Sequence, residues 1–187
     1  DVVALGLGVK NYKVGDRVAY GTEIGGYAEE RNISAERIVP FPQQLSFDDA
    51  AAVMLRGMTV RYLFCETYKI VPTTTLLFHA AAGGVGLIAC QWARAIGATV
   101  IGTVYDSIGR ETFHQSLECL KPKGLMVSFG NASGPVLPFE LSVLKGSLFI
   151  TRPSLMEYTK TRESLVKNAS HVFQMLIDCK IKTTIHH

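Results

Sequence analysis

His79-Ala80-Ala81-Ala82-Gly83-Gly84-Val85-Gly86 is the stretch of sequence that decides the fold. It overlaps an apolar run, Leu76–Ala80, that is typical of a buried strand. In the pattern G-x-G-x-x-G, which marks the first turn of dinucleotide-binding βαβ units, Ala81, Gly83 and Gly86 occupy the three glycine positions. The second position lets the backbone approach a diphosphate, and the third lets helix and strand pack closely. Alanine at the first position widens the turn slightly.

The residues after the glycines predict a helix and a second strand. Gly97 would end the helix, and Ala98–Val104 has the composition of a strand. The helix carries one apolar stripe with the spacing of a face that packs on a sheet, made by Val85, Ile88, Ala89, Trp92, Ala93 and Ile96. The glycine pattern requires this context, so we predict a diphosphate on the free N–H groups of the helix N-terminus. The alternative is a plain glycine-rich turn between a strand and a helix.

The rest of the chain divides into two regions with different sequence patterns. Residues 1–45 hold short β-type runs closed by glycine and aspartate, which predict a small antiparallel barrel or part of one. Ser46 is placed to cap a helix with acids in its first turn, and we expect this helix to be interrupted near Gly57. From Thr75 onward strands and helices alternate, as in a parallel α/β sheet. Further elements are expected as a helix marked by Phe113, Leu117 and Leu120, strands at 124–129 and 147–150, and a last helix capped by Thr161.

Composition excludes several classes of protein. The chain has 187 residues, of which 48% are hydrophobic and 19% charged, so it can bury a core and is not a disordered tail. The net charge of +3 comes from scattered cations and does not favour nucleic-acid binding. The four cysteines lie far apart, which favours free thiols in a reducing compartment. The uncharged segment 70–93 contains proline, threonines and a glycine pair, so we expect a soluble, cytoplasmic protein with no membrane span or secretory leader.

One acidic residue bears on the choice of dinucleotide. Asp106 stands 20 residues after Gly86, where an acid would bind the adenosine ribose and favour NAD.

Several strings in the chain are similar to one known family. HAAAGGVG at 79–86, followed by LIACQWARAIGATVIGTV at 87–104, resembles the zinc-free quinone oxidoreductases, the ζ-crystallin-like enzymes of the medium-chain dehydrogenase/reductase superfamily. The likeness continues in KVGDRVAY at 13–20, AAVMLRGMTVRYLF at 51–64 and KGSLFITRPSLMEY at 145–158. It implies an α/β fold, in which a Rossmann-type doubly wound parallel sheet is joined to part of a GroES-like β-barrel domain.

The resemblance also implies a division into domains. Residues 1–55 would form the partial barrel domain and linker helix, 56–152 the dinucleotide-binding domain, and 153–187 a return helix toward the barrel. Between IGTV and YDSIGR the family has a helix-strand-helix segment whose lysine and tyrosine read the adenosine 2′-phosphate, and this segment is missing here. We therefore expect an omitted segment, seen as a wide gap between Cα atoms near Val104–Tyr105 in place of the usual ~3.8 Å. Asp106 would then belong to a later strand, whereas a continuous peptide would make it a serious NAD determinant.

By the same likeness, the cofactor site maps onto matching positions of this chain. Thr59 and Tyr62 would lie near the nicotinamide, unless both are ordinary helix residues. The other cofactor-binding candidates are Gly83, Gly84, Val85, Gly86, Ser107, Ile108, Phe129, Gly130, Asn131, Pro153, Ser154 and Leu155. For Phe129 and Leu155 simple loop packing remains an alternative. We name no catalytic side chain, and we interpret His79 as a packed core histidine in preference to a general acid.

The function implied by the resemblance is an NADPH-dependent quinone oxidoreductase without zinc. Residues 1–45 contain neither cysteine nor histidine, so the barrel part offers no zinc ligands of these types. One alternative is an NADPH-dependent alkenal or enone reductase of the same fold. Another is a crystallin-like structural or RNA-binding protein that retains a cofactor site. Family members pair edge strands across a homodimer at the position of 147–150, so a homodimer is expected as well.

Overall fold

The computed structural model describes residues 1–183 and 185, with the backbone alone for 99–102. These residues form two compact units. Unit 1 contains Asp1–Tyr62 and the described residues from Leu155 on, and unit 2 contains Leu63–Ser154.

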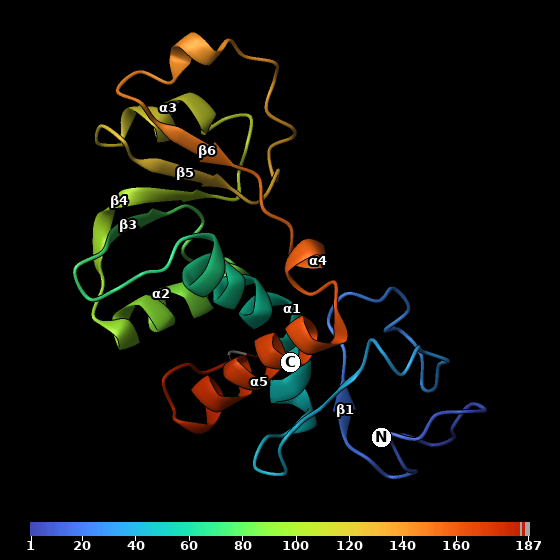
Figure 1. Ribbon diagram of the computed structural model, residues 1–187. Coiled ribbons are helices and arrows are strands. Elements are labelled where there is room, and N and C mark those ends of the chain that lie inside the picture. Colours follow the sequence, from blue (N-terminus) through green and yellow to red (C-terminus); the bar gives the residue numbers. More distant parts are fainter. Residues whose placement is uncertain (184, 186–187) are drawn as a thin grey trace. The chain divides into compact units, whose positions relative to one another are not determined.

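Unit 2 is built on a parallel sheet of four strands in the order β3-β4-β5-β6 (Figure 1). Its α-helices and strands are β3 (Thr75–Phe78), α2 (Gly84–Ile96), β4 (Thr99–Asp106), α3 (Phe113–Glu118), β5 (Leu125–Ser128) and β6 (Phe149–Thr151). A π-helix (Leu63–Thr67) precedes the sheet, and a 3-10 helix (Leu141–Val143) lies before β6. The alternation of strands and helices confirms the predicted α/β, Rossmann-like architecture.

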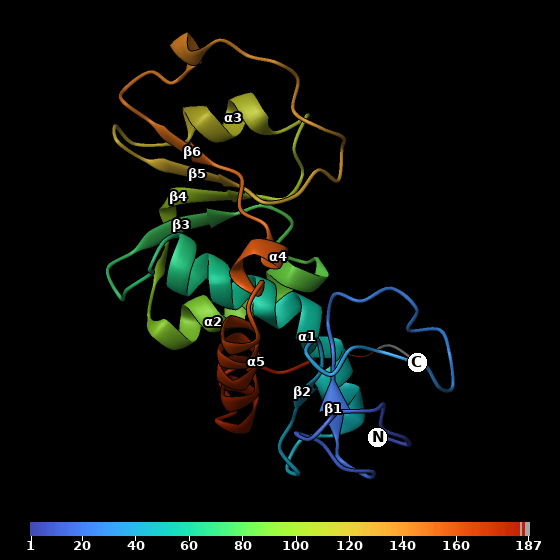
Figure 2. The ribbon, with the colours of Figure 1, turned by 45° about the vertical axis from the view of Figure 1, so that its right-hand side comes forward.

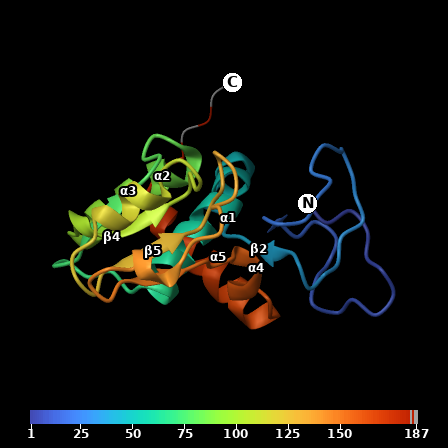
Figure 3. The ribbon, with the colours of Figure 1, turned by 90° about the horizontal axis from the view of Figure 1, so that it is seen from above.

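The four strands follow one another in chain order. Right-handed connections that all advance in one direction place their helices on the same face of a sheet. Accordingly, α2 and α3 lie on one side of the strands when the molecule is seen from above (Figure 3). The reversal of strand order that defines a doubly wound sheet does not occur among the described strands.

Strand β4 corrects one expectation. Val104 pairs with Leu77 on one side and Met126 on the other, and the strand continues to Asp106 without a break. The expected gap at Val104–Tyr105 is therefore wrong. The irregularity lies upstream, because Thr75 of β3 opposes Thr99 whereas the next residue, Leu76, opposes Thr103. Part of β4 thus bulges out of register with β3.

The core of unit 2 lies between the sheet and its helices. The predicted stripe of α2 is buried at Ile88, Ala89, Trp92 and Ala93. The helix ends at Gly97 as predicted, where φ is +83° and the N–H bonds back to the carbonyl of Arg94. On α3, Phe113 and Leu117 pack with Met126 of β5, with Leu120 partly buried beside them.

Unit 1 is organised around α1 (Phe47–Tyr62) and α5 (Arg162–Ile177). Ser46 accepts a hydrogen bond from the N–H of Asp49 at 2.9 Å, which confirms it as the cap of α1. The predicted interruption near Gly57 is wrong, since α1 continues through it. A Cβ at Gly57 would lie 2.5 Å from Cγ1 of Val172, so glycine serves here to bring the two helices close together. Thr161 caps α5 in a reciprocal capping box, as predicted.

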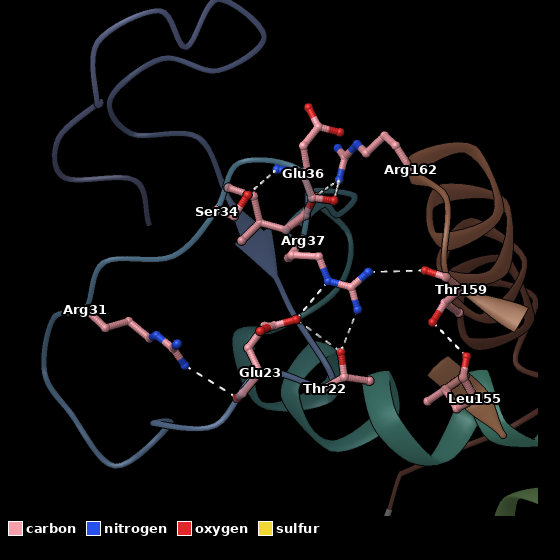
Figure 4. A network of polar contacts seen from close by, with 10 residues as sticks. Thr22, Glu23, Arg31, Ser34, Glu36, Arg37, Leu155, Thr159 and Arg162 are labelled. Atoms are coloured by element: carbon pink, nitrogen blue, oxygen red, sulfur yellow. Dashed lines mark hydrogen bonds and ion pairs between the residues drawn. The ribbon is translucent and has the colours of Figure 1, made fainter. Parts of the chain in front are cut away.

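Residues 1–45 carry little regular structure. Their strands are β1 (Val18–Ala19) and β2 (Val39–Pro40), which pair antiparallel (Figure 2). Arginine side chains hold the loops around these strands. Arg37 donates to the carboxylate of Glu23 at 2.8 Å, to the hydroxyl of Thr22 and to the carbonyl of Thr159, just after the short helix α4 (Leu155–Tyr158) (Figure 4).

Three general properties follow from the described residues. Within the described residues, no two of the four cysteines are joined by a disulfide bond. No helix in the described part of the chain combines the length and the apolar character needed to cross a bilayer. Within residues 1–183 and 185, no three His, Cys, Asp or Glu side chains gather closely enough to hold a metal ion.

Candidate dinucleotide-binding site

The glycine turn ends in a helix whose first amides are free. Gly83 is the N-cap of α2, with extended backbone angles and no side-chain cap. The first hydrogen bond of the helix runs from the N–H of Leu87 to the carbonyl of Gly83 at 2.8 Å. The N–H groups of Gly84, Val85 and Gly86 therefore find no acceptor among the described residues. Three such donors at the positive end of a 13-residue helix suit an anion.

The turn brings two backbone segments into close approach. A Cβ at Gly86 would lie 2.2 Å from the carbonyl oxygen of Ala80 and 2.6 Å from Cα of Ala81. A Cβ at Gly83 would lie 3.1 Å from the same carbonyl. Ala80 itself has φ +54°, a left-handed conformation that costs energy in any residue but glycine. The glycine pattern is therefore required by packing at its third position, as the sequence predicted.

The carboxyl ends of parallel strands lie at one edge of the sheet, and the predicted loops meet there. The N–H of Phe129, after β5, donates to the carbonyl of Asp106, which ends β4, at 2.9 Å. The N–H of Ala132 donates to the carbonyl of Ser107 at 3.1 Å. A Cβ at Gly130 would lie 2.5 Å from that carbonyl oxygen, so glycine allows the two loops to touch. The structure thus brings Ser107, Ile108, Phe129, Gly130 and Asn131 together.

The sequence missed an arginine at the same edge. Arg152 follows β6 and donates through Nη1 to the carbonyl of Ser128 at 2.7 Å. With the amide of Asn131 turned so that its oxygen faces the guanidinium, that oxygen accepts from Nη2 at 3.2 Å. Pro153 is buried and Ser154 exposed immediately after it. In the sequence, the signal that could have revealed Arg152 was a lone basic residue at the carboxyl end of a predicted strand.

Asp106 is fully buried, with no exposed surface. Its Oδ1 accepts from the N–H groups of Ile108 at 2.7 Å and Gly109 at 3.1 Å, and its Oδ2 accepts from the hydroxyls of Thr112 at 2.8 Å and Ser116 at 2.9 Å. These four donors occupy the carboxylate, so it is not free to hold a ribose hydroxyl. The continuous peptide at Val104 does not, after all, make Asp106 an NAD determinant.

The bonds of Asp106 extend to His79. Oγ of Ser116 lies 3.0 Å from Nε2 of His79, the residue between β3 and the left-handed Ala80. His79 is half-buried and hydrogen-bonded, which fits a structural histidine better than a general acid. The sequence signal for this network was the spacing of Thr112, the N-cap of α3, and Ser116, four residues later in the helix.

The remaining candidates, Thr59, Tyr62 and Leu155, belong to unit 1. The hydroxyl of Thr59 donates to the carbonyl of Leu55 within α1 at 2.8 Å. The ring of Tyr62 is buried and stacks on Tyr158 at 4.5 Å between centroids. Leu155 is buried at the start of α4. Their contact with a cofactor stays a prediction.

No family model matches the chain. Quinone oxidoreductase 1 of Escherichia coli (strain K12) is 42% identical over 228 residues, which cover 98% of this chain and 70% of that protein. The 2-haloacrylate reductase of a Burkholderia species is 36% identical, over 92% of this chain and 66% of that protein. The crystal structure of Escherichia coli quinone oxidoreductase complexed with NADPH matches with a TM-score of 0.93 at 42% identity, covering 98% of this chain and 70% of that one.

The aligned region of the Escherichia coli protein is longer than this chain. An alignment of 228 positions with a chain of 187 residues leaves at least 41 positions at which the Escherichia coli protein has residues and this chain has none. That these positions lie near residues 104 and 105 stays a prediction.

Proposed function

The chain belongs to the quinone oxidoreductase family, and we propose that it is an NADPH-dependent quinone oxidoreductase that works without zinc. The observation that carries the proposal is the set of three free N–H groups on Gly84, Val85 and Gly86. A dinucleotide diphosphate is an anion of the kind that such a helix terminus binds.

The residues around the turn fit this cofactor. Gly83 to Gly86 would hold the diphosphate, while Ser107, Ile108 and the loop Phe129–Asn131 would line the groove at the edge of the sheet, together with Pro153 and Ser154. NADPH, when bound, supplies the hydride. The protein's own work is then to orient the cofactor and the acceptor and to keep the pocket dry. We retain Thr59, Tyr62 and Leu155 as proposed cofactor contacts.

We also retain the proposed domains, with a partial barrel and linker over 1–55, a dinucleotide-binding domain over 56–152 and a return helix over 153–187.

The zinc-free character is supported by the sequence. Residues 1–45, which resemble part of the barrel domain, contain no cysteine or histidine, the residue types that hold most structural and catalytic zinc. We expect quinone reduction to persist after dialysis against a chelator, and purified protein to contain far less than one zinc per chain. Loss of activity on chelation, restored by zinc alone, would contradict this.

A second candidate is an NADPH-dependent reductase of enones or alkenals. It is favoured by the 36% identity to the 2-haloacrylate reductase. A panel of quinones and a panel of enones, compared by kcat/KM with NADPH, separates the two. We expect the quinones to be preferred, and fast enone reduction without quinone turnover would replace the first candidate by the second.

A structural or RNA-binding role remains the third alternative. Titration with NADPH and NADH, followed by nicotinamide fluorescence, tests it directly. We expect a saturable change with NADPH. A protein that responds to neither nucleotide has lost the site, and the proposed enzyme activity would be wrong.

The homodimer is proposed from the sheet. Among the described strands, β6 is one of the two at the edges of the sheet, and Phe149 in it is 60% exposed. An edge of this kind can pair with the same edge of a second copy. Light scattering after size exclusion should give twice the chain mass, and a monomer at micromolar concentration would contradict the proposal. The cytoplasmic location stays a prediction, which cell fractionation would test.

A further inference from the structure

We propose that Asp106, Ser116 and His79 form a chain of hydrogen bonds, here called the support chain, that positions the glycine turn for its cofactor. None of the three residues needs to touch the cofactor. The proposal rests on the proposed NADPH site, because the turn that it positions is the one that would hold the diphosphate.

The first step concerns the direction of the protons. The carboxylate of Asp106 receives four hydrogen bonds. An ionised carboxylate has no proton to donate, so it is the acceptor in all four. Ser116 has a single hydroxyl proton, which points to Oδ2 of Asp106 at 2.9 Å. Towards His79 the same oxygen must therefore accept. It follows that Nε2 of His79 carries a proton, and that the neutral imidazole is held as its Nε2–H tautomer.

The second step links His79 to the turn. Its backbone N–H donates to the carbonyl of Tyr105 at 2.9 Å, and its ring bonds to Ser116, so both ends of the residue are held. The next residue, Ala80, is left-handed, and its carbonyl accepts from the N–H of Gly83 at 2.8 Å. A residue fixed on one side of a strained position helps to maintain it. The orientation of Ala80 in turn sets where Gly83 and the first amides of α2 lie.

The third step is that the same carboxylate holds a second loop. Oδ1 of Asp106 binds the N–H groups of Ile108 and Gly109, which follow β4. One buried anion thus fixes both the loop after β4 and, through Ser116, the turn after β3. These are two of the segments proposed to surround the cofactor. Disconnecting one branch should loosen one segment and leave the other in place.

The matched pair Ser116→Ala and Thr112→Val tests this role. Each substitution removes one hydroxyl donor from Oδ2 of Asp106, but only Ser116→Ala disconnects His79. We expect Ser116→Ala to raise the Kd for NADPH about tenfold, because a misplaced binding group loses affinity steeply, while Thr112→Val changes it less than about twofold at a similar loss of Tm. Equal changes in Kd for the two variants, or an unchanged Kd in Ser116→Ala, would overturn the proposal.

The tautomer of His79 gives a second readout that needs no cofactor. Nitrogen-15 NMR of histidine-labelled protein, with His79→Gln for assignment, should show the Nε2–H form in the wild type. In Asp106→Asn the amide can donate to Ser116, which would turn its own proton to His79 and move the ring proton to Nδ1. A wild-type Nδ1–H tautomer, or no change in Asp106→Asn, would overturn the support chain.

The two failures can be told apart. If the wild type binds no NADPH, the proposed function is wrong and the positioning role is wrong with it. If the wild type binds NADPH and Ser116→Ala binds it equally well, only the positioning role is wrong.

Discussion

The two units fix their loops by different means. In unit 2 the loops at the sheet edge are joined largely by backbone hydrogen bonds, as between Phe129 and Asp106, with glycines at the closest approaches. The carboxylate of Asp106 and the guanidinium of Arg152 add side-chain links there. In unit 1 the loops of residues 1–45 depend on long cationic side chains. Arg17 donates to the carbonyls of Pro42, Gln43 and Leu45, and Arg162 to the carbonyl of Ile38 and the hydroxyl of Tyr12.

The difference shows how each unit depends on its sequence. Loops joined through their backbones separate when a side chain is added where none fits. Loops joined by an arginine separate when that side chain is removed. Unit 2 should therefore be sensitive to small gains in volume at glycines, and unit 1 to truncation of its arginines. Substitutions at Gly86 and Arg17 test this contrast.

Gly86→Ala should have the largest effect. Its Cβ would lie 2.2 Å from a backbone carbonyl that cannot rotate away. We expect a loss of about 3 kcal/mol in the free energy of unfolding, and an NADPH Kd raised about a hundredfold in the fraction that folds. Gly6→Ala is the control, because its Cβ meets nothing within 4 Å. A Gly86→Ala protein with the Tm and Kd of the wild type would contradict the close packing of the turn.

Arg17→Ala should destabilise unit 1. The guanidinium donates to three carbonyls and lies 4.3 Å from the ring centroid of Phe41. We expect a loss of about 2 kcal/mol in urea unfolding, with new protease cleavage within residues 1–45. Arg56→Ala, on an exposed position of α1, should change stability by less than about 0.5 kcal/mol. Equal effects of the two variants would remove the contrast between the units.

Alkaline pH should act on unit 2 through Tyr105. Burial raises the pKa of this phenol, and its hydroxyl donates to the carbonyl of Leu63 at 3.4 Å. The folded state therefore keeps the proton that the unfolded chain loses near pH 10, so stability falls as the pH rises above that value. At pH 11 we expect a loss of about 1 kcal/mol that Tyr105→Phe does not show. A Tyr105→Phe variant that loses as much stability as the wild type at pH 11 would contradict this.

Acid should act weakly on unit 1 through His171. Desolvation lowers the pKa of this imidazole, and the charges of Arg61 and Lys180 lower it further. The unfolded chain therefore binds a proton near pH 6.5 that the folded chain binds only at lower pH, and stability declines as the pH falls below about 6.5. His171→Gln should reduce the stability lost on acidification by less than about 0.5 kcal/mol, since solvent screens the site. A His171→Gln variant with the same slope as the wild type would contradict this.

The sequence predicted best what is determined locally. The strand, the glycine turn, the stripe of α2 and its end at Gly97 depend on neighbours a few residues apart, and each was found where it was expected. Gly57 was misinterpreted because its reason lies on α5, at Val172. Asp106 has the spacing of a ribose-binding acid, but Thr112 and Ser116 occupy it. Spacing alone cannot reveal such partners, since it does not say which helix covers a strand end.

The arginine contacts of unit 1 could not be predicted either. Arg162 reaches residues more than 100 positions away in the sequence, and no local pattern marks a guanidinium that will bind distant carbonyls. Sequence patterns in residues 1–45 predicted β structure, which the fold provides only in β1 and β2.

Trp92 has a use beyond packing. It is the sole tryptophan of the chain, and at 1% exposure it lies on the buried face of α2. Indole emission therefore originates in unit 2 alone, while helical ellipticity comes largely from α1 and α5 of unit 1. Recording both signals in one denaturant series would show which half melts first, without any attached dye.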